Sequence, residues 1–218
     1  MSGASDPRLE GWGRVPLPGR EIRSEDYESV TRGAALSRGL GRSYGDSSLP
    51  ARREDLVASS VLADRILGFV PATGVLHAEA GLSMQAMNRV FLSRGFYSPV
   101  TPGTQQITLG GMVAADVHGK NHHRDGTFGA HVQRLRVRVA DGRVLWCSPD
   151  EEPDLFRATI GGMGLTGHVL EVVCRLARIP SPWIYAESER MPDIDSYIEG
   201  LKTAARDWPQ TMGWIDCL

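Results

Sequence analysis

The chain has 218 residues, with 24 Lys and Arg against 26 Asp and Glu, which gives a formal net charge of −2. This balance excludes a generally basic nucleic-acid binder, so we expect no nucleic-acid partner. Hydrophobic residues make up 41 % of the chain, and the 25 glycines bring the apolar share into the ordinary globular range. The length is sufficient for one or two domains with a proper core.

No stretch of about 18 apolar residues occurs, and the N-terminus lacks the apolar segment of a signal peptide. We therefore expect no transmembrane segment and a cytoplasmic location. The three cysteines, Cys147, Cys174 and Cys217, are far apart in the sequence. This spacing is typical of reduced, buried thiols without a disulfide.

Glycines and prolines crowd residues 1–20, which predicts an irregular N-terminal arm that docks through Trp12. Ser24, followed by acidic residues, is typical of a helix N-cap, and we expect this helix to end before Gly39. The next glycine-rich segment, residues 39–45, is predicted to be a loop.

Strands are predicted near residues 66–70 and over residues 74–81, where apolar residues alternate with others. Ser83 then favours a helix over residues 84–92, which Gly95 ends. Residues 99–129 are rich in glycine and histidine and too long for an ordinary connection, so we expect a long functional loop there.

The second half predicts a β-hairpin, with strands over residues 132–139 and 144–146 joined by an Asp-Gly turn. The further predicted elements, in chain order, are a short helix over residues 154–160, a glycine turn at 161–167, a strand over 168–179, a helix over 193–205 and a strand that begins at 214–218. A lone last strand has no obvious partner, so we expect the sequence to be a fragment.

Residues 162–167 match the pattern GxGxxG, but their context differs from that of a Rossmann nucleotide site. A Rossmann fingerprint follows a strand and opens a helix, whereas this one follows a short helix and opens a strand. Together with residues 39–45 and 102–111, it makes three glycine-rich segments in one small domain. Glycine lets backbone N–H groups approach a ligand closely, so the three segments favour a large phosphate-bearing cofactor.

Four histidines, His118, His122, His123 and His131, lie within fourteen residues. No acidic or cysteine pattern completes a familiar ligand set, so we expect no metal; backbone hydrogen bonding and a cofactor or substrate pocket remain open. A Ser/His/Asp hydrolase built on Ser43, His118 and Asp116 is disfavoured because the sequence has no GxSxG elbow.

The glycine segments, Pro102-Gly103-Thr104, Gly110-Gly111 and the run His118-Gly119-Lys120-Asn121-His122-His123 together resemble a known family. They are similar to the FAD-binding half of the decaprenylphosphoryl-β-D-ribose oxidases, flavoproteins of the vanillyl-alcohol-oxidase type. The resemblance runs from Gly11 to the last residues. It implies an α+β fold in which two small sheets with surrounding helices bind FAD in an extended form.

The resemblance also implies three parts: an N-terminal arm (residues 1–20), an FAD-binding domain (21–180) and the beginning of an incomplete substrate domain (181–218). The residues it implies for cofactor binding are Gly39, Leu40, Gly41, Arg42, Ser43, Tyr44, Gly45, Pro102, Gly103, Thr104, Thr108, Gly110, Gly111, Ala114, His118, Gly119, Asn121, His122, Gly162, Gly164, Gly167 and Val169. Those implied on the substrate side are His118, Lys120 and Tyr44.

The implied reaction is oxidation of a secondary ribose hydroxyl of a polyprenyl-phosphate sugar to a ketone, after which a separate reductase completes epimerisation to arabinose. Contact with a membrane would come only through this substrate. Some relatives, such as the alditol oxidases, bind FAD covalently through a histidine at the place of Tyr44. Tyrosine cannot form that bond, so we expect non-covalent FAD. An alditol or sugar oxidase and a non-catalytic FAD-binding remnant are the alternatives.

Overall fold

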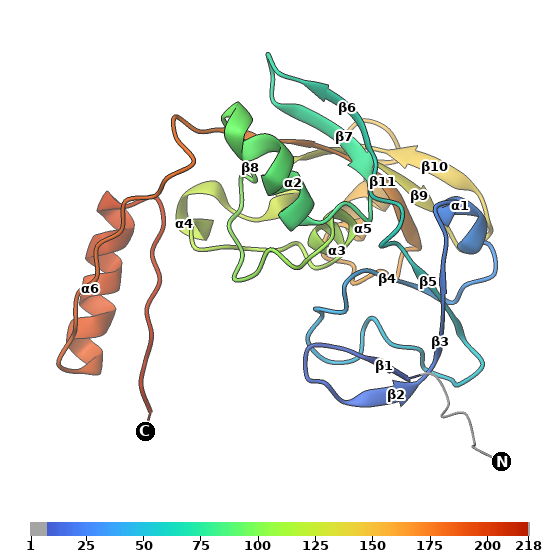
Figure 1. Cartoon of the computed structure of the whole chain (residues 1–218), viewed down its shortest axis with the longest axis horizontal. Coiled ribbons are helices and arrows are strands. Elements are labelled where there is room, and N and C mark those ends of the chain that lie inside the picture. Colours follow the sequence, from blue (N-terminus) through green and yellow to red (C-terminus); the bar gives the residue numbers. More distant parts are fainter. Residues whose placement is uncertain (1–7, 218) are drawn as a thin grey trace.

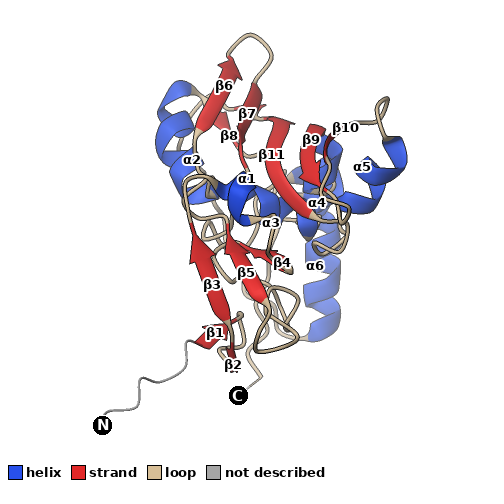
Figure 2. Ribbon diagram, turned by 90° about the vertical axis from the view of Figure 1, so that its right-hand side faces the viewer, coloured by secondary structure: helices blue, strands red, loops and turns tan. Residues whose placement is uncertain are grey.

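The computed structural model describes residues 8–217, and two sheets of different kind form its framework (Figures 1 and 2). The smaller sheet is parallel, with β5 (Leu56–Ser59) between β3 (Arg20–Arg23) and β4 (Leu36–Arg38). The larger sheet is antiparallel and has five strands in the order β10-β9-β11-β7-β6. The α+β expectation with two small sheets is thus confirmed.

The five-stranded sheet follows the predicted strands closely. Its strands are β6 (Ile66–Val70), β7 (Val75–Glu79), β9 (Val132–Arg138), β10 (Val144–Cys147) and β11 (His168–Arg175). The hairpin of β9 and β10 pairs Arg138 with Val144 and Leu135 with Cys147, as the Asp-Gly turn predicts.

Two antiparallel ribbons complete the fold. The first is not predicted, and the second corrects the strand expected over residues 168–179, which breaks after Arg175 and continues in another sheet. β1 (Arg8–Glu10) pairs with β2 (Pro16–Pro18), and β8 (Phe96–Tyr97) pairs with β12 (Ala177–Arg178). The irregular-arm prediction is therefore wrong for residues 8–18, because prolines are tolerated in an edge strand that needs few backbone donors. Leu9 anchors the first ribbon by packing with Leu49 and Val57.

The first predicted helix is much shorter than expected. α1 spans Tyr27–Val30, and its N-cap is Asp26, which accepts a hydrogen bond from the Ser29 N–H, rather than Ser24. The helix cannot run on to Gly39 because residues 36–38 pair with β5 as strand β4. Strand β5 itself, only four residues long, went unpredicted.

The remaining helices agree better with the sequence. α2 (Met84–Phe91) begins at its Ser83 cap, and a 3-10 turn (Leu92–Arg94) ends at Gly95, which adopts a φ of 78°. The expected long loop at residues 99–129 instead contains α3 (Leu109–Ala114), α4 (His122–Asp125) and the start of a 3-10 turn (Phe128–His131). α5 (Pro153–Thr159) lies where a short helix was predicted.

The main hydrophobic core lies between the five-stranded sheet and the helices α2 and α3. The largest side chains that it buries completely include Phe128, Leu76, Met87, Leu109 and Met112. α3 is thus anchored on its apolar side, while Gly111 on the same helix is exposed. Because the core fixes α3, it also fixes the loops that meet the two ends of this helix.

Residues 180–217, which we call the tail, differ from the rest, residues 8–179, which we call the body. The tail carries α6 (Ile194–Asp207), which is capped by Asp193 and stands to one side of the body (Figure 1). Residues 214–217 form no strand, so that prediction is wrong for the described residues, and Leu218 lies outside them. None of the described helices is long and apolar enough to cross a membrane.

The cysteines were predicted to be buried. Cys147 and Cys174 are buried, and burial raises the pKa of the Cys174 thiol to about 12. Cys217 is exposed, which corrects the prediction for that residue, because the tail has no core around it.

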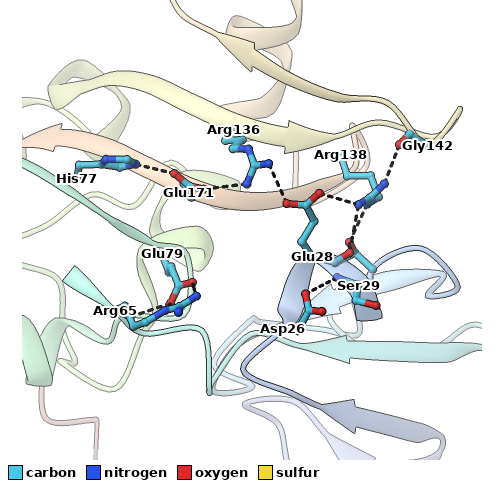
Figure 3. A network of polar contacts seen from close by, with 11 residues as sticks. Asp26, Glu28, Ser29, Arg65, His77, Glu79, Arg136, Arg138, Gly142 and Glu171 are labelled. Carbon is cyan, nitrogen blue, oxygen red and sulfur yellow. Dashed lines mark hydrogen bonds and ion pairs between the residues drawn. The ribbon is translucent and has the colours of Figure 1, made fainter. Parts of the chain in front are cut away.

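A network of charges ties α1 to the five-stranded sheet (Figure 3). Glu28 on α1 forms ion pairs with Arg136 (2.8 Å) and Arg138 (3.4 Å), and Arg136 continues to Glu171 (2.9 Å). His77 bonds to the other oxygen of Glu171 at 2.6 Å. The network thus fixes the position of α1 relative to the N-terminal half of β11, which begins at His168.

Candidate functional site

The first glycine segment leaves the carboxyl end of β4, on the parallel sheet. Gly41 and Gly45 have φ angles of 66° and 65°, a left-handed conformation that glycine adopts without strain. A Cβ atom at Gly45 would meet nothing within 4 Å, so this backbone faces open space. The carboxyl edge of parallel strands is where open sheets bind ligands.

The N-terminal ribbon docks onto this segment, as the prediction for Trp12 required. The Trp12 N–H donates to the Ser43 carbonyl at 3.2 Å, and its ring meets Tyr44 edge-on at 6.3 Å. Tyr44 is 81 % exposed, and Arg42 is exposed as well. These two side chains therefore project from the loop towards solvent or a ligand.

The second glycine segment forms the start of α3. The Thr108 hydroxyl caps the helix by accepting from the Gly111 N–H at 3.2 Å. Gly39 lies directly against Thr108, since a Cβ atom at Gly39 would come within 2.5 Å of the Thr108 Oγ1. The first segment thus meets the N-terminal end of α3, and only glycine permits that approach.

The third glycine segment, residues 161–167, meets the other end of α3. The Gly161 N–H donates to the Val113 carbonyl at 2.9 Å, and the Met163 N–H donates to the Ala114 carbonyl at 2.8 Å. Gly167 has a φ of 135° and lies against the Arg138 backbone. The segment follows α5 and precedes β11, so the expected contrast with a Rossmann fingerprint is confirmed.

Beside the three glycine segments, residues 99–104 pack against residues 118–122 and form a further cluster. A Cβ atom at Gly119 would lie 2.6 Å from the Thr101 nitrogen, and the Lys120 N–H donates to the Thr101 carbonyl at 3.0 Å. Gly103 beside this contact is exposed, with nothing within 4 Å of a Cβ atom. Thr104 accepts from the Gln106 N–H at 3.1 Å.

Asn121 holds this cluster together from inside. Its side-chain nitrogen donates to the Pro99 carbonyl and to Asp125, both at 2.7 Å, and its oxygen accepts from the Thr101 N–H at 3.1 Å. The residue is only 5 % exposed. Its side chain is therefore fully used within the protein, and any contact of Asn121 with a cofactor has to come from the backbone.

The histidines of this cluster are exposed. The His118 and His122 rings lie 6.1 Å apart, and the His122 Nδ1 is 3.0 Å from the Gly119 carbonyl. Within residues 8–217, the side chains of His118 and Lys120 make no hydrogen bond or ion pair. No group of three acidic, cysteine or histidine side chains in these residues could hold a metal ion.

Most of the residues predicted to bind the cofactor, the glycine segments and Thr108 among them, come together around α3. Val169 does not fit this arrangement through its side chain, because that side chain is buried in the core and faces Val137 across the sheet. Three further residues, Thr101, Ser37 and His168, are not indicated by the sequence, although their contacts join distant segments. No local pattern marks such contacts.

These residues fit an extended, phosphate-bearing cofactor such as FAD. Exposed backbone at Gly45, Gly103 and Gly164 faces free space, so N–H groups there can approach a diphosphate without a side chain in the way. Buried polar atoms without a protein partner also lie beside the first segment, at Arg38 and Ser48. A site that leaves such atoms unpaired is suited to a polar ligand.

Comparisons with known proteins point the same way. Residues 30–148 match the family model described as "FAD binding domain". The decaprenylphosphoryl-beta-D-ribose oxidase of Mycolicibacterium smegmatis is 33 % identical over 97 % of this chain and 48 % of that protein. The D-arabinono-1,4-lactone oxidase of Yarrowia lipolytica is 25 % identical over 90 % of the chain and 37 % of that protein.

The mitochondrial D-2-hydroxyglutarate dehydrogenase of Bos taurus is 30 % identical over 55 % of this chain and 23 % of that protein. The chain spans about half the length of the first of these relatives and less of the others. The match to this family runs from the last residue of α1 to just past β10, and thereby covers two of the three glycine segments around α3. The chain therefore belongs to the family of FAD-binding domains, and decaprenylphosphoryl-β-D-ribose oxidase is among its relatives.

Proposed function

We propose that this chain is the FAD-binding portion of an oxidoreductase that oxidises a secondary hydroxyl of a sugar. The substrate would be decaprenylphosphoryl-ribose, converted to its 2-keto form as the first half of epimerisation to arabinose. The observation that carries the proposal is the 33 % identity to decaprenylphosphoryl-beta-D-ribose oxidase along 97 % of the chain. A separate reductase would complete the epimerisation, and membrane contact would come through the polyprenyl chain.

The glycine segments would hold the cofactor by their backbones. Residues 39–45 and 102–104 would direct N–H groups at the diphosphate, and Gly110, Gly111 and Ala114 would line the path between them. Gly162, Gly164 and Gly167 would lie near the adenine end, with Val169 present through its backbone. FAD supplies the hydride acceptor in such reactions, while the protein orients it and excludes competing chemistry.

The substrate side would be formed by His118, Lys120 and Tyr44. The Lys120 ammonium, which has no ion-pair partner in residues 8–217, would attract the substrate phosphate. The His118 ring, exposed and free of hydrogen bonds in the same residues, would accept the hydroxyl proton as the C–H bond breaks. Tyr44 would lie beside the sugar.

The cofactor would be bound without a covalent link, because tyrosine at position 44 cannot form a histidyl–flavin bond. The test is the visible absorption spectrum of the purified protein with added FAD, followed by acid precipitation. We expect the flavin absorbance to move into the supernatant. Colour that stays in the pellet would overturn the non-covalent assignment, and failure to take up any flavin would overturn FAD binding by this chain.

An oxidase of free sugars, alditols or sugar lactones is the second candidate, favoured by the match to D-arabinono-1,4-lactone oxidase over 90 % of the chain. The two candidates separate when the FAD-loaded protein is mixed without oxygen with a polyprenyl-phosphate ribose or with arabinono-lactone. Loss of the flavin colour with only one of them identifies the substrate class. Loss with neither would favour a non-catalytic FAD-binding remnant.

A further inference from the structure

A chain of three buried or half-buried polar side chains connects parts of the molecule that are far apart in sequence. The Tyr27 hydroxyl lies 2.5 Å from the Ser37 Oγ, and the Ser37 Oγ lies 2.7 Å from the His168 Nδ1. Tyr27 belongs to α1, Ser37 to β4 on the parallel sheet and His168 to β11 on the antiparallel sheet. The chain therefore joins the two sheets through side chains.

The positions of Ser37 and His168 relate this chain to the FAD site. Ser37 stands two residues before Gly39, where the first glycine segment begins. His168 directly follows Gly167, where the third segment ends. The hydrogen bond between them thus holds together the roots of two loops that approach opposite ends of α3.

The direction of the hydrogen bonds follows from the available donors and acceptors. The Ala34 backbone also faces the His168 ring as an acceptor, which raises the pKa of that ring. When the neutral ring carries its hydrogen on Nε2, Nδ1 accepts from the Ser37 hydroxyl, whose oxygen accepts in turn from Tyr27. Tyr27 is 4 % exposed, so its hydroxyl donor has no access to bulk water.

A proton on the His168 Nδ1 would remove the acceptor at the end of the chain. Nδ1 would then donate to the Ser37 oxygen, and one hydroxyl hydrogen, of Ser37 or of Tyr27, would lose its acceptor in a buried or half-buried place, which is costly. Burial lowers the pKa of His168, and Arg138, opposite it on β9, lowers the pKa further, against the bond to Ala34. The other ionisable groups facing this region from α1 are Tyr27 and Glu28, which pairs with Arg138.

We propose that Tyr27, Ser37 and His168 form a clamp that holds residues 39–45 and 161–167 in the arrangement that FAD requires, and that protonation of His168 opens the clamp. Ser37 and His168 are positioning residues in this proposal, which rests on the proposed binding of FAD. Because the pKa of His168 is lowered, the ring in the folded protein stays neutral at pH 6.5, the ordinary histidine value, and becomes protonated only at lower pH.

The test measures FAD affinity by flavin fluorescence between pH 5 and pH 8. Because burial lowers the pKa of His168 from its ordinary value of 6.5, we expect FAD binding by the wild type to stay constant down to this pH and to weaken as the pH falls further towards 5. Ser37→Ala should weaken FAD binding about tenfold at pH 7.5 while the circular dichroism spectrum stays unchanged. His168→Asn keeps an acceptor oxygen close to the Nδ1 position, so it should bind like the wild type at pH 7.5 and lose the acid weakening.

The matched control is His77→Asn. His77 is a half-buried histidine of the same sheet, and its partner is Glu171, in the network of Figure 3, rather than a glycine segment. It should retain the wild-type dependence on pH. Equal affinity in Ser37→Ala and the wild type, or an unchanged pH profile in His168→Asn, would overturn the clamp.

A second readout separates this proposal from FAD binding itself. Amide hydrogen exchange in the FAD-free protein should be faster at residues 39–45 and 161–167 in Ser37→Ala than in the wild type, and unchanged in the core strand β7. Unchanged exchange at both loops would contradict the clamp. If the wild type takes up no FAD at any pH, the proposed function fails, and the exchange measurement still decides whether the clamp exists.

Discussion

The body and the tail use their apolar residues in opposite ways. The body buries its large side chains in a core that spans the five-stranded sheet, α2 and α3. The tail buries none of the residues of α6, and Trp183, Tyr185 and Trp214 are 86 %, 73 % and 85 % exposed. The geometry of the glycine segments therefore depends on packing within the body, and the tail contributes little to it.

The tail nevertheless touches the body at one place, beside α4. The Thr211 N–H donates to the Lys120 carbonyl at 3.0 Å, and Arg124 donates to the Arg206 carbonyl at 2.9 Å. These contacts join half-buried or exposed residues, so their net contribution is small. Substitutions in the body should accordingly cost far more than substitutions in the tail.

The largest effect is expected for Gly119→Ala. The added methyl group would press against the Thr101 backbone, which cannot move without displacing the Asn121 bonds. We expect a loss of about 3 kcal/mol in the free energy of unfolding, seen as a lower midpoint in thermal denaturation. Gly33→Ala is the control, since nothing lies within 4 Å of a Cβ atom there. Similar midpoints for both variants would contradict the close packing.

The second largest effect is expected for Tyr27, whose burial makes the free energy of unfolding depend on pH in the alkaline range. Burial raises the pKa of this phenol to about 12. The folded state therefore keeps the proton that the unfolded state releases above pH 10, and stability falls as the pH rises from 10 to 12. The wild type should lose about 2–3 kcal/mol in this window that Tyr27→Phe does not lose. Denaturant unfolding at both pH values measures the difference.

Tyr185 provides the contrast from the tail. It is 73 % exposed, so Tyr185→Phe should retain the alkaline loss of the wild type. A Tyr27→Phe protein that loses as much stability as the wild type between pH 10 and 12 would show that this phenol is not buried.

A somewhat smaller loss is expected for Asn121→Ala. The change removes three hydrogen bonds and leaves the Thr101 N–H and the Pro99 carbonyl without this partner, at a cost of about 2 kcal/mol. Asn88→Ala is the matched control, because the Asn88 oxygen has no partner and alanine favours the helix. In chemical denaturation, Asn121→Ala should therefore lower the free energy of unfolding, whereas Asn88→Ala should leave it unchanged or raise it. Equal losses in the two variants would contradict the role given to Asn121.

The smallest effect is expected in the tail. Trp214→Ser should change the free energy of unfolding by less than about 0.5 kcal/mol, since the ring is exposed. Chemical denaturation measures this change. A loss of stability as large as that of Asn121→Ala would show that the tail contributes to folding as much as the body does.

Local patterns in the sequence predicted much of the fold. The alternation at residues 66–70 and 74–81, the Asp-Gly hairpin and the Ser83 cap each depend on residues close in sequence, and each prediction is confirmed. The failures are non-local. Residues 36–38 leave the expected helix because β5 pairs with them, and residues 8–18 become a ribbon because Leu9 finds a core partner in Val57.

In the candidate site, too, local features could be predicted from the sequence and non-local contacts could not. Glycine spacing pointed to the segments that gather around α3, because close backbone approach requires glycine wherever it occurs. It could not indicate that Asn121 is turned inwards, since Pro99 and Thr101 are more than fifteen residues away. The bond between Ser37 and His168 spans 131 positions, and only the assembled sheets bring these residues together.

The most direct measurement is an FAD titration of the wild type, Gly103→Leu and Gly33→Leu, followed by flavin fluorescence. Both glycines face open space, so both variants should fold, but only Gly103 lies in a segment assigned to the cofactor. We expect Gly103→Leu to weaken FAD binding at least tenfold, whereas Gly33→Leu should bind FAD like the wild type. Equal affinities in all three proteins would contradict a cofactor site formed by the glycine segments.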